Sequence, residues 1–282
     1  MKLVFALAAA VSCLCTSLFA AVPRATPVVV VMLENHSYSS VIGNASMPYL
    51  NSLASTYGLA TQSYANAHPS IGNYFMLTTG QIVTTNDNFT GTITNDNIVR
   101  HFLTKGITWK SYAEGLPSIG YTGGNTGTYV KRHNPFAYFS DVANSSLKNN
   151  IVPFTQFASD VANGSLPEFS FIAPDICDDA HNCSLATADA WLKSKLAPLL
   201  ASAAFQQNGL LVITFDESFT TDTAHGGGHI ATIIVSPKAK RAFKSANLYQ
   251  HQNVLRMVME AVGMTTFPGA AATAWDMGTF FP

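Results

Sequence analysis

Two short runs of apolar residues constrain the fold of this chain more than any other feature. Residues 28–33 (VVVVML) and 210–215 (LLVITF) are rich in β-branched residues and show no polar face. Runs of this kind are typical of the central strands of a parallel sheet, which helices cover on both sides. We therefore expect both segments to be buried strands of an α/β fold.

Each run ends in a pair of side chains that carry oxygen. Glu34 and Asn35 follow the first run, and Asp216 and Glu217 follow the second. Ligand sites of open α/β sheets lie outside the carboxyl ends of the strands, so these side chains should meet there. Clustered carboxylates repel one another unless a cation lies among them, which predicts a divalent metal site with oxygen ligands. The alternative is that they are merely polar residues where strands meet loops.

The rest of the chain alternates between helical and strand patterns. This alternation predicts β-α-β units and a three-layer α/β/α sandwich with a mostly parallel central sheet. A length of 282 residues allows one large domain or two smaller ones, and no strong linker appears. We expect a single domain over residues 22–282. Helices are predicted at 47–57, 98–105, 154–162, 185–204 and 253–262, and further strands at 107–112, 168–173 and 230–235.

The amino terminus has the pattern of a secretory signal peptide. A lysine at position 2, an apolar stretch and small residues near Ala20 and Ala21 predict a signal over residues 1–21. The mature protein would be secreted or periplasmic. No later apolar stretch reaches the ~18 residues of a membrane-spanning helix, so we expect no integral membrane segment after signal removal.

Two of the four cysteines belong to the mature chain. Cys177 and Cys183 are expected to form a disulfide in an oxidising compartment. Zinc binding is the alternative, although two cysteines and the intervening His181 make an incomplete structural zinc set. The formal net charge is −1 and no basic run is present, so nucleic acid is not an expected partner.

Ser70 lies where a helix should begin. Pro69 and Gly72 mark a turn, and the apolar residues after it indicate a helix. A nucleophile at a helix start lies among unpaired N–H groups and the positive end of the dipole, which suits a phosphate. The alternative is an ordinary N-cap serine.

Five short motifs occur in a fixed order along the chain. They are Glu34-Asn35-His36-Ser37-Tyr38, Ser70-x-x-Asn73, KRHNPF at residues 131–136, DDAH at 178–181, and Phe215-Asp216-Glu217. Together they resemble the phosphoesterase family that includes secreted acid phosphatases and non-specific phospholipases C. The resemblance implies a core similar to that of alkaline phosphatases and hydrolysis of phosphate esters through a Ser or Thr nucleophile beside a metal ion.

The resemblance also implies roles for individual residues. Glu34, Asn35, Asp216 and Glu217 would hold one divalent ion, and Ser70 would complete its ligand shell as the nucleophilic alkoxide. His133 and His181 would contact the phosphate or donate a proton to the leaving group. Four oxygen ligands without cysteine favour Ca²⁺, Mg²⁺ or Mn²⁺ over zinc.

Two positions depart from the family pattern. Gly72 replaces a proline before Asn73, and Ala180 interrupts an Asp-Asp-His-Pro type of motif, whose final proline is missing. The other histidines have open roles. His68, His225 and His229 could reach the site. His251 is expected to anchor the last helix or to reach the site from the edge of the sheet, and His36 and His101 are expected to be structural or exposed.

The expected function is that of a secreted, metal-dependent acid phosphatase that hydrolyses phosphate monoesters through a seryl-phosphate intermediate. A phospholipase C or another phosphodiesterase is the first alternative, with a phospholipid head group as substrate. A non-catalytic ligand-binding surface protein of the same fold is the second.

Overall fold

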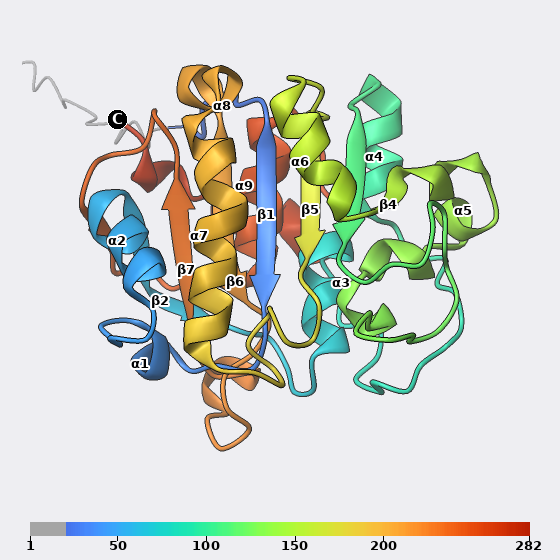
Figure 1. Ribbon diagram of the computed structural model, residues 1–282, viewed down its shortest axis with the longest axis horizontal. Helices are drawn as coiled ribbons and strands as arrows, with labels where there is room; N and C mark the ends of the chain where they lie inside the picture. Colours follow the sequence, from blue (N-terminus) through green and yellow to red (C-terminus); the bar gives the residue numbers. More distant parts are fainter. Residues whose placement is uncertain (1–20) are drawn as a thin grey trace, which may run out of the picture.

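A single eight-stranded sheet forms the centre of the molecule in the computed structural model, which describes residues 21–282 (Figure 1). The strand order is β4-β3-β5-β1-β6-β7-β2-β8. The strands are β1 Val28–Leu33, β2 Gly58–Tyr64, β3 Trp109–Ala113, β4 Ile151–Pro153, β5 Phe169–Ala173, β6 Leu210–Phe215, β7 His229–Val235 and β8 Phe243–Ser245.

The sheet is mostly parallel, as predicted. Strand β7 pairs antiparallel with both of its neighbours, β6 and β2, and every other pairing among the strands is parallel. Strands β2, β4 and β8 were not predicted. β2 contains the polar stretch Thr61-Gln62-Ser63, and the edge strands β4 and β8 have only three residues each, so none of them shows an apolar run.

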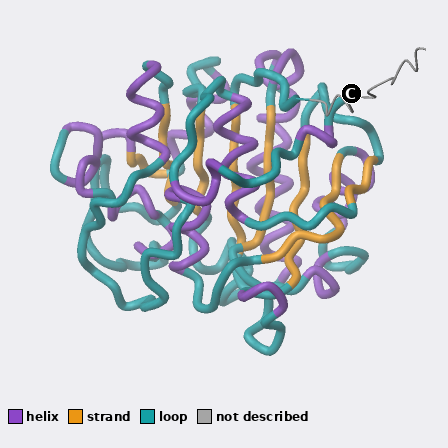
Figure 2. Tube along the Cα trace, turned by 180° about the vertical axis from the view of Figure 1, so that it is seen from behind, coloured by secondary structure: helices purple, strands orange, loops and turns teal. Residues whose placement is uncertain are grey.

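Helices cover both faces of the sheet, which confirms the three-layer sandwich (Figures 1 and 2). Alternate residues of β1 point to opposite faces: Val28, Val30 and Met32 join one core and Val29, Val31 and Leu33 join the other. The helices are α1 Tyr38–Val41, α2 Pro48–Thr56, α3 Ile71–Thr79, α4 Ile98–Lys105, α5 Ser140–Ala143, α6 Thr155–Ala162, α7 Leu185–Ala201, α8 Ala203–Asn208 and α9 His251–Ala261.

The predicted helix at 185–204 is in fact two helices. The backbone of Ser202 is extended, with φ −68° and ψ 144°, so α7 ends at Ala201. The Ser202 side chain then accepts a hydrogen bond from the Phe205 N–H and caps α8. The hydrophobic pattern alone did not reveal this break.

The predicted signal peptide lies outside the described residues except for Ala21. Among residues 21–282, no helix has the length and apolar character needed to cross a membrane. Strands β1 and β5 point towards the lower edge of Figure 1, and β1 and β6 pair in parallel as direct neighbours, with Leu33 opposite Phe215 at their ends. The residues that follow these two strands therefore start side by side.

Candidate active site

The register of β1 and β6 brings the two acidic pairs together. The Asn35 N–H donates a hydrogen bond to Asp216 Oδ1 at 2.9 Å. Glu34, Asp216 and Glu217 are at most 1% exposed, so their carboxylates lie inside the protein and not on a solvated rim. Asn35 has φ 44°, a left-handed conformation that asparagine tolerates better than most residues.

Ser70 lies against the same cluster, immediately before the first residue of α3. Its Oγ is 3.1 Å from Glu34 Oε2, 3.4 Å from Asn35 Oδ1 and 3.4 Å from Glu217 Oε1. The side chain makes no capping hydrogen bond to its own helix. The Ile71 N–H instead donates a hydrogen bond to Asp87 Oδ1 at 3.1 Å. The Ser70 hydroxyl thus faces the acids, which does not support the N-cap alternative.

The arrangement of oxygen atoms fits a divalent cation. The inward-facing end of the Asn35 amide lies 2.9 Å from Glu34 Oε2 and 3.2 Å from Asp216 Oδ1, and only acceptors surround it when its oxygen points inward. Buried acceptors so close together need a shared proton, a cation or, with the Asn35 amide turned, hydrogen bonds from its nitrogen to Glu34 and Asp216. Glu34, Asn35, Asp216 and Glu217, with the Ser70 hydroxyl, offer the oxygen donors that Ca²⁺, Mg²⁺ and Mn²⁺ prefer.

The charges of the cluster support the same interpretation. Burial raises the pKa of Asp216 to about 7, and burial together with the neighbouring Asp216 raises that of Glu217 to about 9. Burial, together with Asp216 and Asp179, also raises the pKa of Glu34 well above its usual value. Several buried carboxylates therefore cannot all ionise without a positive partner.

His133 lies beside the cluster in a line of three buried groups. Its Nδ1 is 3.1 Å from Asp179 Oδ2 and its Nε2 is 3.4 Å from Glu34 Oε1. Tyr74 stacks on the imidazole with ring centroids 5.3 Å apart and donates a hydrogen bond to Glu34 Oε1. Burial lowers the pKa of His133 well below its usual value.

Glu34, His133 and Asp179 each offer a ligand atom within 4.8 Å of the others, so they could also hold an ion. The imidazole faces Glu34 with Nε2 and Asp179 with Nδ1, and neither His133 Nε2 nor Asp179 Oδ2 has a hydrogen-bond partner in the described structure. His133 and Asp179 thus border Glu34 and extend the buried cluster.

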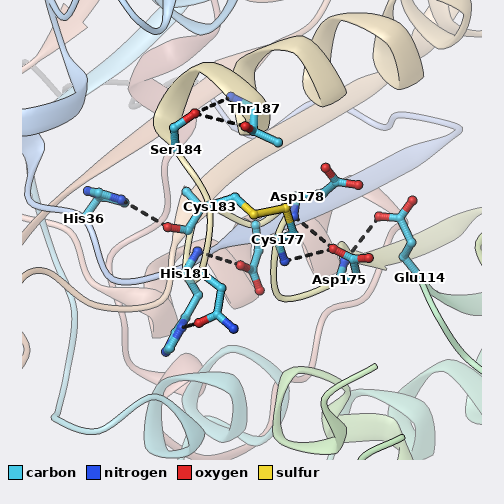
Figure 3. Close-up of a disulfide and its surroundings, with 12 residues drawn as sticks. His36, Glu114, Asp175, Cys177, Asp178, His181, Cys183, Ser184 and Thr187 are labelled. Atoms are coloured by element: carbon cyan, nitrogen blue, oxygen red, sulfur yellow. Dashed lines mark hydrogen bonds between the residues drawn. A yellow bond between two sulfur atoms is a disulfide. The ribbon is translucent and has the colours of Figure 1, made fainter. Parts of the chain in front are cut away.

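The disulfide between Cys177 and Cys183 is present and closes the loop that carries Asp179 and His181 (Figure 3). The Asp179 carbonyl accepts a hydrogen bond from the Glu34 N–H at 2.9 Å, which docks the loop on the end of β1. Asp179 is buried, whereas His181 is exposed, with its ring 6.5 Å from that of His133. Because the two sulfur atoms are bonded to each other, the zinc alternative does not apply.

The sequence relationships agree with this geometry. The profile of the Phosphoesterase family matches residues 44–265. The chain belongs to this family. It is 32% identical over 246 residues to a phosphatidylinositol-3-phosphatase of Mycobacterium tuberculosis, covering 86% of this chain and 79% of that protein. It is also 32% identical over 258 residues to an acid phosphatase of Aspergillus fumigatus, covering 88% of this chain but only 56% of that protein.

Solved structures share the fold of this phosphoesterase at much lower identity. The lipoteichoic acid synthase LtaP of Listeria monocytogenes superposes with a TM-score of 0.65 at 12% identity, over 93% of this chain and 77% of that one. A protein of the alkaline phosphatase superfamily from Vibrio parahaemolyticus gives 0.56 at 13% identity, over 87% and 68% of the two chains. The alkaline-phosphatase-like core is thereby confirmed, and the phosphoesterase is a hydrolase of phosphoric ester bonds.

Two further histidines of the phosphoesterase contact the acidic cluster. His68 Nδ1 is 2.7 Å from Glu217 Oε2, and His68 Nε2 is 2.9 Å from the Asp222 carbonyl. His251, at the start of α9, lies with Nε2 2.7 Å from the Asp216 carbonyl, and burial lowers its pKa to about 4. His251 therefore joins the last helix to the site as a neutral hydrogen-bonding group.

The remaining histidines lie further out. His36 Nε2 is 3.3 Å from the Ala180 carbonyl, and His101 pairs with Asp96 at the surface. His229 stacks between Tyr38 and Tyr64, and His225 packs against Tyr64. In the part of the chain that the structure describes, none of these four rings forms a hydrogen bond or an ion pair with the side chains of the acidic cluster.

Sequence reasoning missed several residues that complete the site. Tyr74 could have been found, because it follows Ser70 by four positions and so faces the same side of the helix. Asp179 belongs to the DDAH motif at residues 178–181, in which the resemblance gives a role to His181 alone. Asp87 comes from a loop and Arg132 from the single 3-10 turn Lys131–His133, where no periodic pattern indicates which side chains point inward.

Proposed function

We propose that this phosphoesterase is a secreted, metal-dependent acid phosphatase that hydrolyses phosphate monoesters through a seryl-phosphate intermediate. One observation carries the proposal: the Ser70 hydroxyl lies 3.1 to 3.4 Å from oxygen atoms of Glu34, Asn35 and Glu217 within a buried acidic cluster. A serine in this place is available as a nucleophile only where a cation compensates the acids.

Glu34, Asn35, Asp216 and Glu217 would hold one divalent ion. Such an ion lowers the pKa of a nearby hydroxyl and neutralises charge that develops on the phosphoryl oxygens. Tyr74 and His133 would fix the Glu34 carboxylate, and His68 would fix that of Glu217. These contacts keep the oxygen ligands in place while the substrate enters and product leaves.

The Ser70 oxygen would attack phosphorus and form the phosphoserine as the ester P–O bond breaks. The departing alkoxide needs a proton, and the exposed His181 would donate it. Water would then attack the phosphoserine, releasing inorganic phosphate and restoring the Ser70 hydroxyl. The Ser70 proton would pass to solvent in the first step and return from solvent in the last, and His181 would regain its proton from the attacking water.

Two observations support the finer parts of the proposal. The names of the mycobacterial and fungal relatives describe phosphatases, which favours monoesters over the diesters of a phospholipase C. The amino-terminal pattern and the disulfide support an exported protein. The chain spans only 56% of the length of these two fungal relatives. The proposal therefore takes from them the phosphatase reaction and not the activity of the whole proteins.

The proposal is tested by trapping the intermediate. The mature protein is mixed with 4-nitrophenyl phosphate, quenched in acid and digested, and the peptide that contains Ser70 is examined by mass spectrometry. We expect a phosphorylated Ser70 and no turnover after treatment with a chelator, with recovery on adding Mg²⁺, Mn²⁺ or Ca²⁺. Turnover without phosphoserine, or full activity in a metal-stripped sample, would contradict the proposal.

A further inference from the structure

Arg132 has hydrogen-bond donors that the described protein does not use. It lies next to His133 in the short 3-10 helix Lys131–His133, and its side chain is 17% exposed. No described residue accepts a hydrogen bond from its guanidinium, and Nε is buried without such a partner. Its nearest acidic contact is Asp87 Oδ2, 3.4 Å from Nε.

This is unusual because a guanidinium carries five N–H donors, and buried donors are normally satisfied. Two other arginines of the described chain use theirs: Arg24 donates to the Val262 carbonyl at 2.6 Å, and Arg100 donates to Asp141 at 2.9 Å. The donors of Arg132 are thus available to a ligand that is not part of the protein.

The position of Arg132 indicates which ligand this is. The next residue, His133, has its Nε2 3.4 Å from Glu34 Oε1, and the other oxygen of that carboxylate is 3.1 Å from the Ser70 hydroxyl. Arg132 therefore belongs to a segment that borders the nucleophile. A group that binds to Ser70 and to Arg132 at once should be small and anionic.

Asp87 connects Arg132 to the nucleophile. One carboxylate oxygen, Oδ2, contacts Arg132, and the other, Oδ1, accepts a hydrogen bond from Ile71 N at 3.1 Å. Ile71 is the residue after Ser70 and the first residue of α3. A single carboxylate therefore fixes the distance between the guanidinium and the start of the nucleophile helix.

We propose that Arg132 binds the non-bridging oxygens of the substrate phosphoryl group and that Asp87 is the residue that positions it. A planar guanidinium can donate two parallel hydrogen bonds to a phosphate, a geometry that lysine cannot reproduce. The inference rests on the proposed function and names the residue that would select its monoester substrates. A monoester dianion carries one more negative charge than a diester, so Arg132 should favour monoesters.

A purely structural ion pair is the competing explanation. The Arg100–Asp141 pair offers a matched control, since it also joins Nε to Oδ2, at 2.9 Å, between segments 41 residues apart. Exposed pairs of this kind contribute little to stability. Arg100→Gln should therefore leave phosphate binding unchanged, as should Arg132→Gln if Arg132 were only structural.

The experiment measures the affinity of inorganic phosphate as a competitive inhibitor and, independently of turnover, by calorimetric titration of the metal-loaded protein. Arg132→Gln should weaken phosphate binding about 10- to 100-fold, the loss expected for hydrogen bonds between charged groups. Arg132→Lys should recover only part of it. Asp87→Asn keeps an oxygen for Ile71 and should cause a smaller loss that is not additive with Arg132→Gln.

The ratio of turnover on 4-nitrophenyl phosphate to turnover on bis(4-nitrophenyl) phosphate gives a second readout. It should fall in Arg132→Gln, because the monoester loses more charge compensation than the diester. Unchanged phosphate affinity and an unchanged ratio, with folding and metal content intact, would overturn the assignment of Arg132 while the proposed function stands. If the wild-type protein hydrolyses no phosphate ester, the proposed function fails, and calorimetry still decides whether Arg132 binds phosphate.

Discussion

His68 Nδ1 lies 2.7 Å from Glu217 Oε2, and the other oxygen of the same carboxylate lies 3.4 Å from Ser70 Oγ. Since His68 precedes Ser70 by only two residues, one short segment both supplies the candidate nucleophile and holds a candidate metal ligand in position. The histidine is held in turn through Nε2 by the Asp222 carbonyl at 2.9 Å.

Removing His68 should therefore weaken metal binding without removing a ligand. Loss of a residue that orients a ligand commonly lowers metal affinity 10- to 100-fold, and we expect a loss of that size in His68→Ala. Titration of metal-stripped protein with Mn²⁺ measures it. His101→Ala is the control, because His101 also pairs with an acid at 2.9 Å, but that acid, Asp96, is 49% exposed and lies outside the acidic cluster. Equal affinities for His68→Ala and wild type would show that Glu217 needs no such support.

Ser70→Ala should abolish most turnover and leave the fold intact. Loss of a nucleophile commonly lowers kcat by at least about 10³-fold, because residual catalysis then depends on binding and electrostatics alone. Ser63→Ala is the matched control. Ser63 is also buried but contacts Thr232, with the two hydroxyl oxygens 2.8 Å apart. Steady-state rates with circular dichroism test the pair, and near-wild-type kcat in Ser70→Ala would exclude the serine as nucleophile.

The acidic cluster predicts how metal and pH together set stability. Burial raises the pKa of Asp216 to about 7 and that of Glu217 to about 9 in the folded protein, whereas both have ordinary values of roughly 4 when unfolded. Between these pKa values the two carboxyl groups are ionised in the unfolded chain but still protonated in the folded chain. The metal-free protein should thus lose stability as pH rises from about 4 to 9.

A bound dication removes that penalty, so metal should stabilise the protein more at pH 8 than at pH 5. At a metal concentration of ~100 Kd the expected rise in Tm at pH 8 is about 5–10 °C. Thermal melts with and without Mg²⁺ at the two pH values provide the measurement, with Asp216→Asn as the control that should show a smaller shift. An equal shift at both pH values would contradict the prediction.

The proposed proton donation by His181 predicts a dependence on the leaving group. A 4-nitrophenolate departs without a proton, whereas an alkoxide such as glycerol requires one. His181→Ala should therefore lower kcat/KM for glycerol phosphate by about 10²-fold or more and that for 4-nitrophenyl phosphate by much less. His225→Ala is the control, since His225 is also exposed but packs on Tyr64. A similar loss on both substrates would indicate a binding role instead.

Much of the fold follows from local pattern. The strands β1 and β6 and helix α4 were predicted with the bounds that the structure shows, because apolar runs and helical spacing are properties of consecutive residues. The edge strands could not be predicted in this way. β8, for example, is held by pairing with β2 across a large sequence distance, and its three residues carry no signal of their own.

The candidate site also contains residues that local pattern predicts and residues that it does not. Glu34, Asn35, Asp216 and Glu217 could be placed together because they follow strands whose ends share an edge. The contacts of Arg132 with Asp87 and of His133 with Asp179 join irregular segments far apart in the chain. Their geometry depends on how loops pack, which neither composition nor periodicity records.

The pairing of β1 with β6 limits how the lengths of these two strands can change in evolution and in engineering. Six consecutive residues of each strand are matched without a bulge, from Val28 opposite Leu210 to Leu33 opposite Phe215. Inserting one residue in either strand would turn the acid that follows it to the opposite face of the sheet. Loops around the active site can lengthen and diversify as substrates change, but these two strands can only be altered together and in equal steps.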